Sequence, residues 1–244
     1  MAAFRDGNDP LSEFGLNEEG VEQFRVSNEK GRNPQIENLV KAWRTEVNCP
    51  EVLPYKEALV KYFINTLKDQ EDRLEAKLDE LDDENEESDD RANKMALHDI
   101  YSMDMERVKY SLARYLRVRI LKIENMVHYI DSSSDQIGRL SEHEKEFLYS
   151  LQRINNNYRS DQIERKVLNG NTAEKRAKTY LTFMNDALIK NEEPDLNTFV
   201  FAMPETDLSI RTNNGTRDLN RSAVNVIDYA SIKEKVYSEE VSLM

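Results

Sequence analysis

The stretch IYSMDMERVKYSLARYLRVRILKIE, residues 100–124, decides the fold class of this chain. It holds no Gly or Pro, and apolar residues recur along it and beyond it at the three- and four-residue spacing of a helix. The main stripe consists of Tyr101, Met105, Val108, Leu112, Tyr115, Ile123, Met126 and Ile130. A second apolar set consists of Met103, Tyr110, Ile120, Leu121 and Val127. Because a one-sided surface helix needs only one stripe, the pattern predicts a long helix over about 97–131 with several neighbours.

The length of this predicted helix bears on assembly. At 1.5 Å per residue it extends for about 50 Å, whereas a compact chain of this size has a radius of gyration of about 18 Å. The helix must therefore protrude or be covered by other subunits.

The flanking sequence predicts further helices, because no Gly occurs between Arg32 and Ile137 and no Pro between Tyr55 and Glu193. Asn33-Pro34 is typical of a helix start, and that helix ends before Pro50. A second helix opens at Pro54 and runs into an acidic stretch. In the fourth helix, Ser141-x-x-Glu144 forms a capping box. A further helical stretch is expected over 173–189.

The pattern changes after Pro194 and indicates strands. Residues 198–203, 208–212, 222–227 and 241–244 have β character, Asn213-Asn214-Gly215 is a turn signal, and 229–237 is expected to be one short helix.

The predicted fold class is therefore mainly α, with a small C-terminal β-rich module. We expect a flexible acidic tail over 1–32 and a helical bundle domain with long protruding helices over 33–192. Within that domain, an acidic loop is expected over 79–93. The β-rich module covers 193–244 and is small enough to need docking on something else.

The sequence offers little that would support catalysis. Three histidines, His98, His128 and His143, are far apart and lack the spacing of a metal site. The single cysteine, Cys49, rules out a disulfide within the chain and fits a reducing compartment. No Gly-rich phosphate loop or nucleophile motif is present. We expect no enzymatic activity and no cofactor, and neither a signal peptide nor a membrane span.

Two interpretations of the basic strip stay open. Residues 105–123 carry six Lys and Arg and one acid, Glu106, in a chain of net charge −13. Tyr and Arg are enriched as anchors of protein interfaces, which favours subunit contacts. The alternative is a helical nucleic-acid-binding module that uses the same strip, although the acidic balance argues against general nucleic-acid coating.

Several blocks resemble the Sld-five subunit family of the eukaryotic GINS complex. LVKAWRTEVNCPEVLPY (39–55) is similar to the opening block of that family, and residues 100–124 are similar to its most specific block. LSEHEKEF (140–147) and PDLNTFVFAM (194–203) resemble the next helix start and the entry to the β module. Residues 228–243 resemble the last turn and strand, with two departures. Asp228 stands where the family usually has Arg, and residues 238–240 include no Gly.

The resemblance implies a structural, non-catalytic subunit of the heterotetrameric GINS complex, located in the nucleus. That complex joins the MCM ring and a third component to form the CMG helicase, and it supports initiation of DNA replication and fork progression. The implied partners are the three other GINS subunits and, through the complex, MCM and the third component. A replisome hub could bind the N-terminal tail, and DNA contact would be weak or indirect.

A set of aromatic, aliphatic and basic side chains is expected at the interfaces with these partners. They are Trp43, Arg44, Tyr55, Tyr101, Met105, Arg107, Val108, Leu112, Arg114, Tyr115, Arg117, Arg119 and Ile123 in the helical domain, and Phe199, Phe201, Tyr229 and Val241 in the β-rich module.

Overall fold

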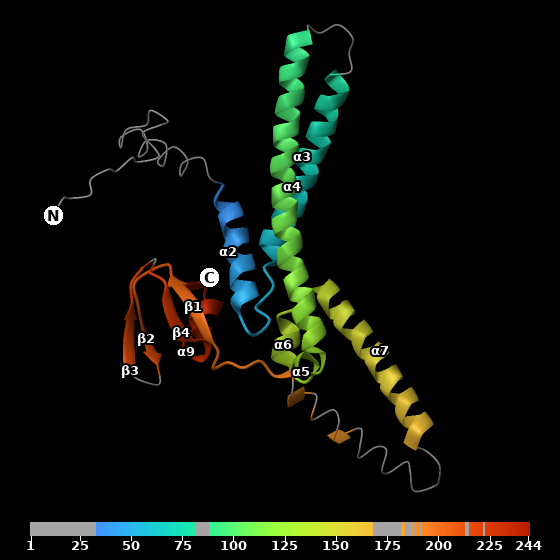
Figure 1. Ribbon diagram of the computed structural model, residues 1–244, viewed down its shortest axis with the longest axis vertical. Coiled ribbons are helices and arrows are strands. Elements are labelled where there is room, and N and C mark those ends of the chain that lie inside the picture. The colour runs from blue at the N-terminus through green and yellow to red at the C-terminus, as the bar shows by residue number, and fades with distance from the viewer. Residues whose placement is uncertain are drawn as a thin grey trace, which may run out of the picture. The chain divides into compact units, whose positions relative to one another are not determined.

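A computed structural model describes residues 33–81, 88–167, 182–183, 187, 189–190, 192–212, 215–221 and 223–244 (Figure 1). The chain divides between Asn38 and Leu39 into two units. All contacts discussed below lie within the second unit. The expected tail (1–32) lies outside the described residues, as does most of the helical stretch expected over 173–189.

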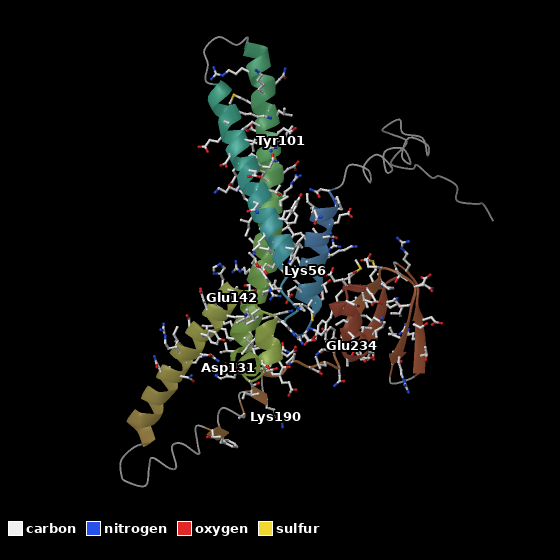
Figure 2. The ribbon with its side chains drawn as sticks, turned by 180° about the vertical axis from the view of Figure 1, so that it is seen from behind. Lys56, Tyr101, Asp131, Glu142, Lys190 and Glu234 are labelled. Carbon is white, nitrogen blue, oxygen red and sulfur yellow. The ribbon has the colours of Figure 1, made fainter. Side chains whose placement is uncertain are left out.

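Helices make up the first part of the described chain. They are α2 (Pro34–Asn48), α3 (Glu57–Leu81), α4 (Ser88–Asn125), α5 (Val127–Asp131), α6 (Ser134–Gly138) and α7 (Glu142–Val167). α3 and α4 lie side by side in opposite directions (Figure 1). Tyr101 lies far along this pair from Lys56, which precedes α3 (Figure 2). The main apolar stripe of α4 packs on α3 in a core that includes Phe63, Leu112 and Tyr115.

The long helix differs from the prediction at both ends. α4 begins at Ser88, so residues 88–93, expected in an acidic loop, are helical, as are residues 79–81 at the end of α3. At the other end Met126 leaves helical geometry, with φ −123° and ψ 29°, and α5 follows as a separate short helix. Met126, Val127 and Ile130 are all buried with Leu140 and Leu148. Apolar residues on both sides of the interruption, Ile123 and Ile130 among them, therefore pack in one core.

The fourth predicted helix is confirmed as α7, together with its capping box. Ser141 N donates to Glu144 Oε2 at 2.8 Å, and Glu144 N donates to Ser141 Oγ at 3.3 Å. The helix continues through residues 155–157 to Val167. α6, a single turn between α5 and α7, was not predicted.

The β-rich module follows Pro194. It comprises β1 (Phe199–Pro204), β2 (Leu208–Thr212), β3 (Gly215–Leu219), β4 (Asn225–Asp228), α9 (Tyr229–Tyr237) and β5 (Val241–Leu243). β1 is central in an antiparallel sheet of order β4-β1-β5, and β2 pairs with β3 as a separate hairpin. Phe199 and Phe201 face outward with 71% and 56% of their surface exposed. β3 was not predicted, because its only buried residue is Leu219 and no alternation is visible.

Three hydrophobic cores meet at the segment 49–56 between α2 and α3. Cys49 and Leu53 belong to the core of the β-rich module, and Val52 belongs to the core of α5 and α7. Tyr55 packs against the third core, formed by α2, α3 and α4. The segment thereby connects all three.

Among the described non-Gly residues, one has a positive φ, and it lies in the turn after α9. Glu239 has φ +62°. Glu239 N donates to Val236 O at 3.2 Å and Glu240 N to Lys235 O at 3.0 Å. These two bonds form a Schellman motif, in which the left-handed position favours Gly.

We expect Glu239→Gly to raise the free energy of unfolding by about 1 kcal/mol. Glycine has no Cβ and adopts this left-handed backbone conformation without the strain that Glu239 bears. Glu234→Gly is the matched control, since Glu234 lies inside α9 (Figure 2) and the same change there should cost about 1 kcal/mol. Denaturant unfolding of both variants would measure the difference. A loss of stability in Glu239→Gly would contradict the explanation.

Candidate functional site

A buried arginine lies where α2, α4 and α7 approach one another. Arg119 has no exposed surface. Its Nε and Nη2 donate to the two carboxylate oxygens of Glu144 at 2.7 and 3.0 Å. Its Nη1 donates to Glu46 Oε2 at 3.1 Å and to Leu53 O at 2.7 Å. The guanidinium thus binds one carboxylate in bidentate fashion and a second one singly.

The surroundings of Arg119 keep it charged. Burial alone would lower its pKa, but the carboxylates of Glu144 and Glu46 more than compensate and raise that pKa. The rings of Tyr55 and Tyr115 lie 5.3 and 5.8 Å from the guanidinium carbon. Burial also raises the pKa of Tyr115 to about 12. A charge removed from water this fully is tolerated only when each partner is in place.

Lys122 extends this centre by one helical turn. Its Nζ donates to Glu46 Oε1 at 3.0 Å and to Glu51 O at 2.8 Å, and it also bonds the carbonyl of Glu46. Arg119 and Lys122 therefore share Glu46, and together they fix the C-terminal end of α2 against α4.

A buried carboxylate forms a second centre, which connects the helices to the β-rich module. Glu51 Oε1 accepts hydrogen bonds from Tyr229 Oη at 2.7 Å and from Tyr237 Oη at 2.5 Å. Its Oε2 accepts from Arg139 Nη1 at 2.9 Å and from Lys233 Nζ at 3.1 Å. Three of these donors come from α9, so one carboxylate holds that helix to the segment 49–56.

The electrostatics of the second centre follow from its burial. Burial alone would raise the pKa of Glu51, but hydrogen bonds from Tyr237, Tyr229 and Lys233 outweigh it and lower that pKa. Burial raises the pKa of the neighbouring Cys49 thiol to about 11. That thiol donates to Tyr229 Oη at 3.2 Å. It is therefore protonated at neutral pH and has little nucleophilic character.

The structure separates the predicted interface residues into three sets. Those buried inside the chain are Leu112, Tyr115, Arg119, Ile123, Tyr229 and Val241. Those of intermediate exposure are Trp43, Tyr55, Met105 and Val108. Those exposed are Arg44, Tyr101, Arg107, Arg114, Arg117, Phe199 and Phe201. The buried set supports the chain's own cores, and the exposed set is available to a partner.

Sequence reasoning missed the carboxylates that neutralise these centres. Glu46 lies seven residues after Leu39 and four after Ala42, so it continues the buried stripe of α2. A charged residue on an otherwise apolar stripe is a signal of a buried ion pair. Glu51 carried no such signal, because it lies in a non-helical segment whose burial depends on α9, about 180 residues further on.

The described residues offer no obvious reactive site. No group of three or more His, Cys, Asp and Glu among them could hold a metal ion. His128 Nδ1 lies 2.5 Å from Glu192 Oε1, and His143 is almost fully exposed. No helix in this part of the chain is both long enough and apolar enough to cross a membrane.

The fold and these centres define a class of protein: a helical scaffold with a docked β-rich module and large exposed side chains. Residues 71–163 match the profile of the GINS complex protein helical bundle domain of Sld5. The chain is 26% identical over 219 residues to the DNA replication complex GINS protein SLD5 of Arabidopsis thaliana, covering 86% of this chain and 90% of the relative.

Other relatives agree with this match. Identity to the SLD5 protein of Yarrowia lipolytica is 28% over 218 residues, covering 86% of this chain and 76% of the relative. Identity to the Homo sapiens protein is 33% over 96 residues, covering 39% of this chain and 36% of the relative. The chain is therefore similar, over most of its length, to proteins named as SLD5 subunits of the DNA replication complex GINS.

We expect Arg119→Met to lower the free energy of unfolding by about 3–5 kcal/mol, because two carboxylates would lose their buried partner. The control is Arg117→Met, which removes an exposed arginine two residues away and should change stability by less than about 0.5 kcal/mol. Denaturant titration would measure both. If the two substitutions lowered the free energy of unfolding equally, the buried pairing of Arg119 would not be a specific source of stability.

The Glu51 centre should make stability depend on pH. Because the folded pKa of Glu51 lies below its ordinary value of 4.5, its contribution is present above pH 4.5 and is lost as the pH falls through the folded pKa. Glu51→Gln should therefore cost about 3–5 kcal/mol at pH 7, and its difference from the unsubstituted chain should shrink below pH 4.5. Thermal unfolding between pH 3 and 7 would measure this, and a constant difference would refute it.

Proposed function

We propose that this chain is a structural, non-catalytic subunit of the heterotetrameric GINS complex. Its similarity to proteins named as SLD5 subunits of GINS, over 86% of its length, is the observation that carries the proposal. The exposed apolar side chains of the helices support it, since large exposed patches of this kind mark interaction surfaces. Examples are Ile100, Tyr101 and Met103 on α4, each about half exposed or more.

The mechanism that we propose is scaffolding. The Arg119 and Glu51 centres hold α2, α4, α7 and α9 in fixed contact, and the outward side chains then meet the three other GINS subunits. Through the assembled complex the chain would support the MCM ring and the third CMG component, in initiation of DNA replication and at the fork, in the nucleus. ATP hydrolysis would belong to MCM.

The interface assignments follow from exposure. Tyr101, Arg114 and Arg117 on α4, and Phe199 and Phe201 on the outer face of the sheet, are the side chains that we propose for direct contact. The buried members of the predicted set would act indirectly by holding the shape of the chain. The expected division into a tail, a helical domain and a β-rich module remains a proposal, and so does a replisome hub on residues 1–32.

A second candidate function is nucleic-acid binding through residues 105–123. Arg114 and Arg117 favour it, because both are exposed and neither forms an ion pair with a described residue. Such binding would weaken steeply with salt. The net charge of −13 argues against it as the main role.

The solution mass of the chain tests the proposal. We expect light scattering to give a one-to-one-to-one-to-one complex after co-expression with the three other GINS subunits. Alone, the chain should self-associate, because its exposed apolar surfaces have no partner. Circular dichroism would check that the chain is folded in both preparations. A well-behaved monomer that ignores all three subunits would contradict the proposal, and DNA affinity at low salt would then support the second candidate.

A further inference from the structure

Arg139, which follows α6, is bonded to both of the buried centres. Its carbonyl oxygen accepts a hydrogen bond from Arg119 Nη2 at 3.2 Å. Its own guanidinium Nη1 donates to Glu51 Oε2 at 2.9 Å and to Tyr237 Oη at 2.6 Å. A continuous path of hydrogen bonds therefore runs from α7 to α9, because Glu144 of α7 is the bidentate partner of Arg119.

The position of Arg139 is fixed on the side of the helices. Its carbonyl oxygen also accepts from Tyr55 N at 3.0 Å, and its Nη2 donates to Asp135 Oδ2 at 2.5 Å. The guanidinium carbon lies 4.7 Å from the centre of the Tyr237 ring. Because the guanidinium is planar and its donors have fixed directions, a shift of the backbone at Arg139 displaces the donor that Glu51 receives from it.

The contact between the helices and the β-rich module is mainly polar. Cys49 and Leu53 are the two residues of the segment 49–56 in the twelve-residue core of the module, and the other ten belong to the module itself. Further contacts across the same boundary are Lys41 Nζ with Glu205 Oε1 at 2.8 Å, Lys56 Nζ with Glu239 Oε1 at 3.0 Å, and Leu243 N with Thr45 Oγ1 at 3.3 Å. The module would therefore keep most of its core if this contact opened.

Opening the contact would not leave Glu51 without a charged partner. Tyr229, Lys233 and Tyr237 belong to α9 and would move away with the module. Arg139 would stay with the helices and keep its ion pair with Glu51. A buried carboxylate without a partner is strongly destabilising, so this pair makes an undocked state accessible.

We propose that Arg139 couples the docking of the β-rich module to the packing of α4 and α7. A fully paired Arg119 holds the Arg139 carbonyl, and the Arg139 guanidinium then holds Glu51 in position for α9. Loosening the Arg119 centre would loosen the docked module, and docking would in turn support the Arg119 centre. The inference goes beyond the proposed function and does not depend on it, because every contact lies within this chain.

The backbone of the segment 49–56 offers a parallel route between the centres. Arg119 Nη1 donates to Leu53 O at 2.7 Å, and Lys122 Nζ donates to Glu51 O at 2.8 Å. Both bonds end on main-chain oxygens, whereas the Arg139 guanidinium bonds to side chains of both Glu51 and α9. Replacing the Arg139 side chain separates the two routes, because it leaves the backbone bonds in place.

Hydrogen exchange of the Leu243 amide reports the docking. This amide donates to Thr45 Oγ1 of α2, whereas the next amide, Met244, donates to Phe201 O inside the module at 2.9 Å. Undocking exposes the Leu243 amide alone, and fraying of β5 exposes both. In the full chain, resolved to single amides by mass spectrometry, we expect Leu243 exchange to depend less on urea than global unfolding does. Equal urea dependence would overturn the inference.

Glu144→Gln tests the effect of the helical packing on docking. Glu144 lies on α7, and its carboxylate binds Arg119. We expect the substitution to speed Leu243 exchange about tenfold and to leave Met244 exchange unchanged. The control is Glu142→Gln, an exposed residue of α7 (Figure 2), which should change either rate less than about twofold. Unchanged Leu243 exchange in Glu144→Gln would contradict the coupling.

A double-mutant cycle assigns the coupling to Arg139. Arg139→Met alone should also speed Leu243 exchange about tenfold. If the two sites were independent, Arg139→Met combined with Glu144→Gln would speed it about a hundredfold. We expect the combined variant to stay within about threefold of Arg139→Met, because the path from Glu144 is already interrupted. A product of the two single effects would show that Arg139 does not carry the coupling.

Asp135→Asn provides a milder test, which leaves every buried group in place. The Asp135 side chain is exposed and orients Nη2 of Arg139. Its substitution should speed Leu243 exchange about threefold, whereas Asp131→Asn, on the exposed end of α5 (Figure 2), should not change it. Equal rates in these two variants would contradict the inference even if Glu144→Gln failed to fold. None of these outcomes depends on assembly with other subunits, so the proposed function is tested separately.

Discussion

The rest of this structure depends on the pairing of buried charges across elements that are distant in sequence. Arg119 on α4 binds Glu46 of α2 and Glu144 of α7, and Glu51 binds Tyr229, Lys233 and Tyr237 of α9. Apolar contacts tolerate small shifts, whereas a buried charge loses several kcal/mol when one partner moves away. The three cores supply most of the stability through burial. The hydrogen bonds of the two centres require specific distances, and they therefore fix how the helices and the β-rich module meet at the segment 49–56.

Local signals in the sequence predicted most of the fold. The capping box at Ser141 and Glu144, the start of α2 at Pro34 and four of the five strands depend on neighbouring residues, so they can be read from a single chain. β3 depends on a tertiary contact, because residues 215–219 form a strand by pairing with β2. The interruption at Met126 has no local signal in the sequence, since residues 123, 126, 127 and 130 keep the spacing of one continuous helical face.

The candidate site was less predictable for the same reason. The arginines and aromatic residues of α4 stood out by composition, but composition did not distinguish Arg119, which is fully buried, from Arg117 two residues earlier, which is exposed. Helical spacing distinguishes them once the inner stripe is known, because Arg119 continues it and Arg117 lies on the other side. The partners of Glu51 come from a helix about 180 residues away, and no local pattern indicates such a contact.

The lone cysteine has a practical consequence. Cys49 is buried and protonated, and its thiol donates a hydrogen bond to Tyr229 at the contact between the segment 49–56 and α9. A cysteine introduced at the surface by mutation would therefore react faster than Cys49. A fluorophore could be attached to the introduced thiol without first removing the native cysteine. The native thiol in turn is a built-in reporter of separation between the helices and the β-rich module, because it becomes accessible only when that contact opens.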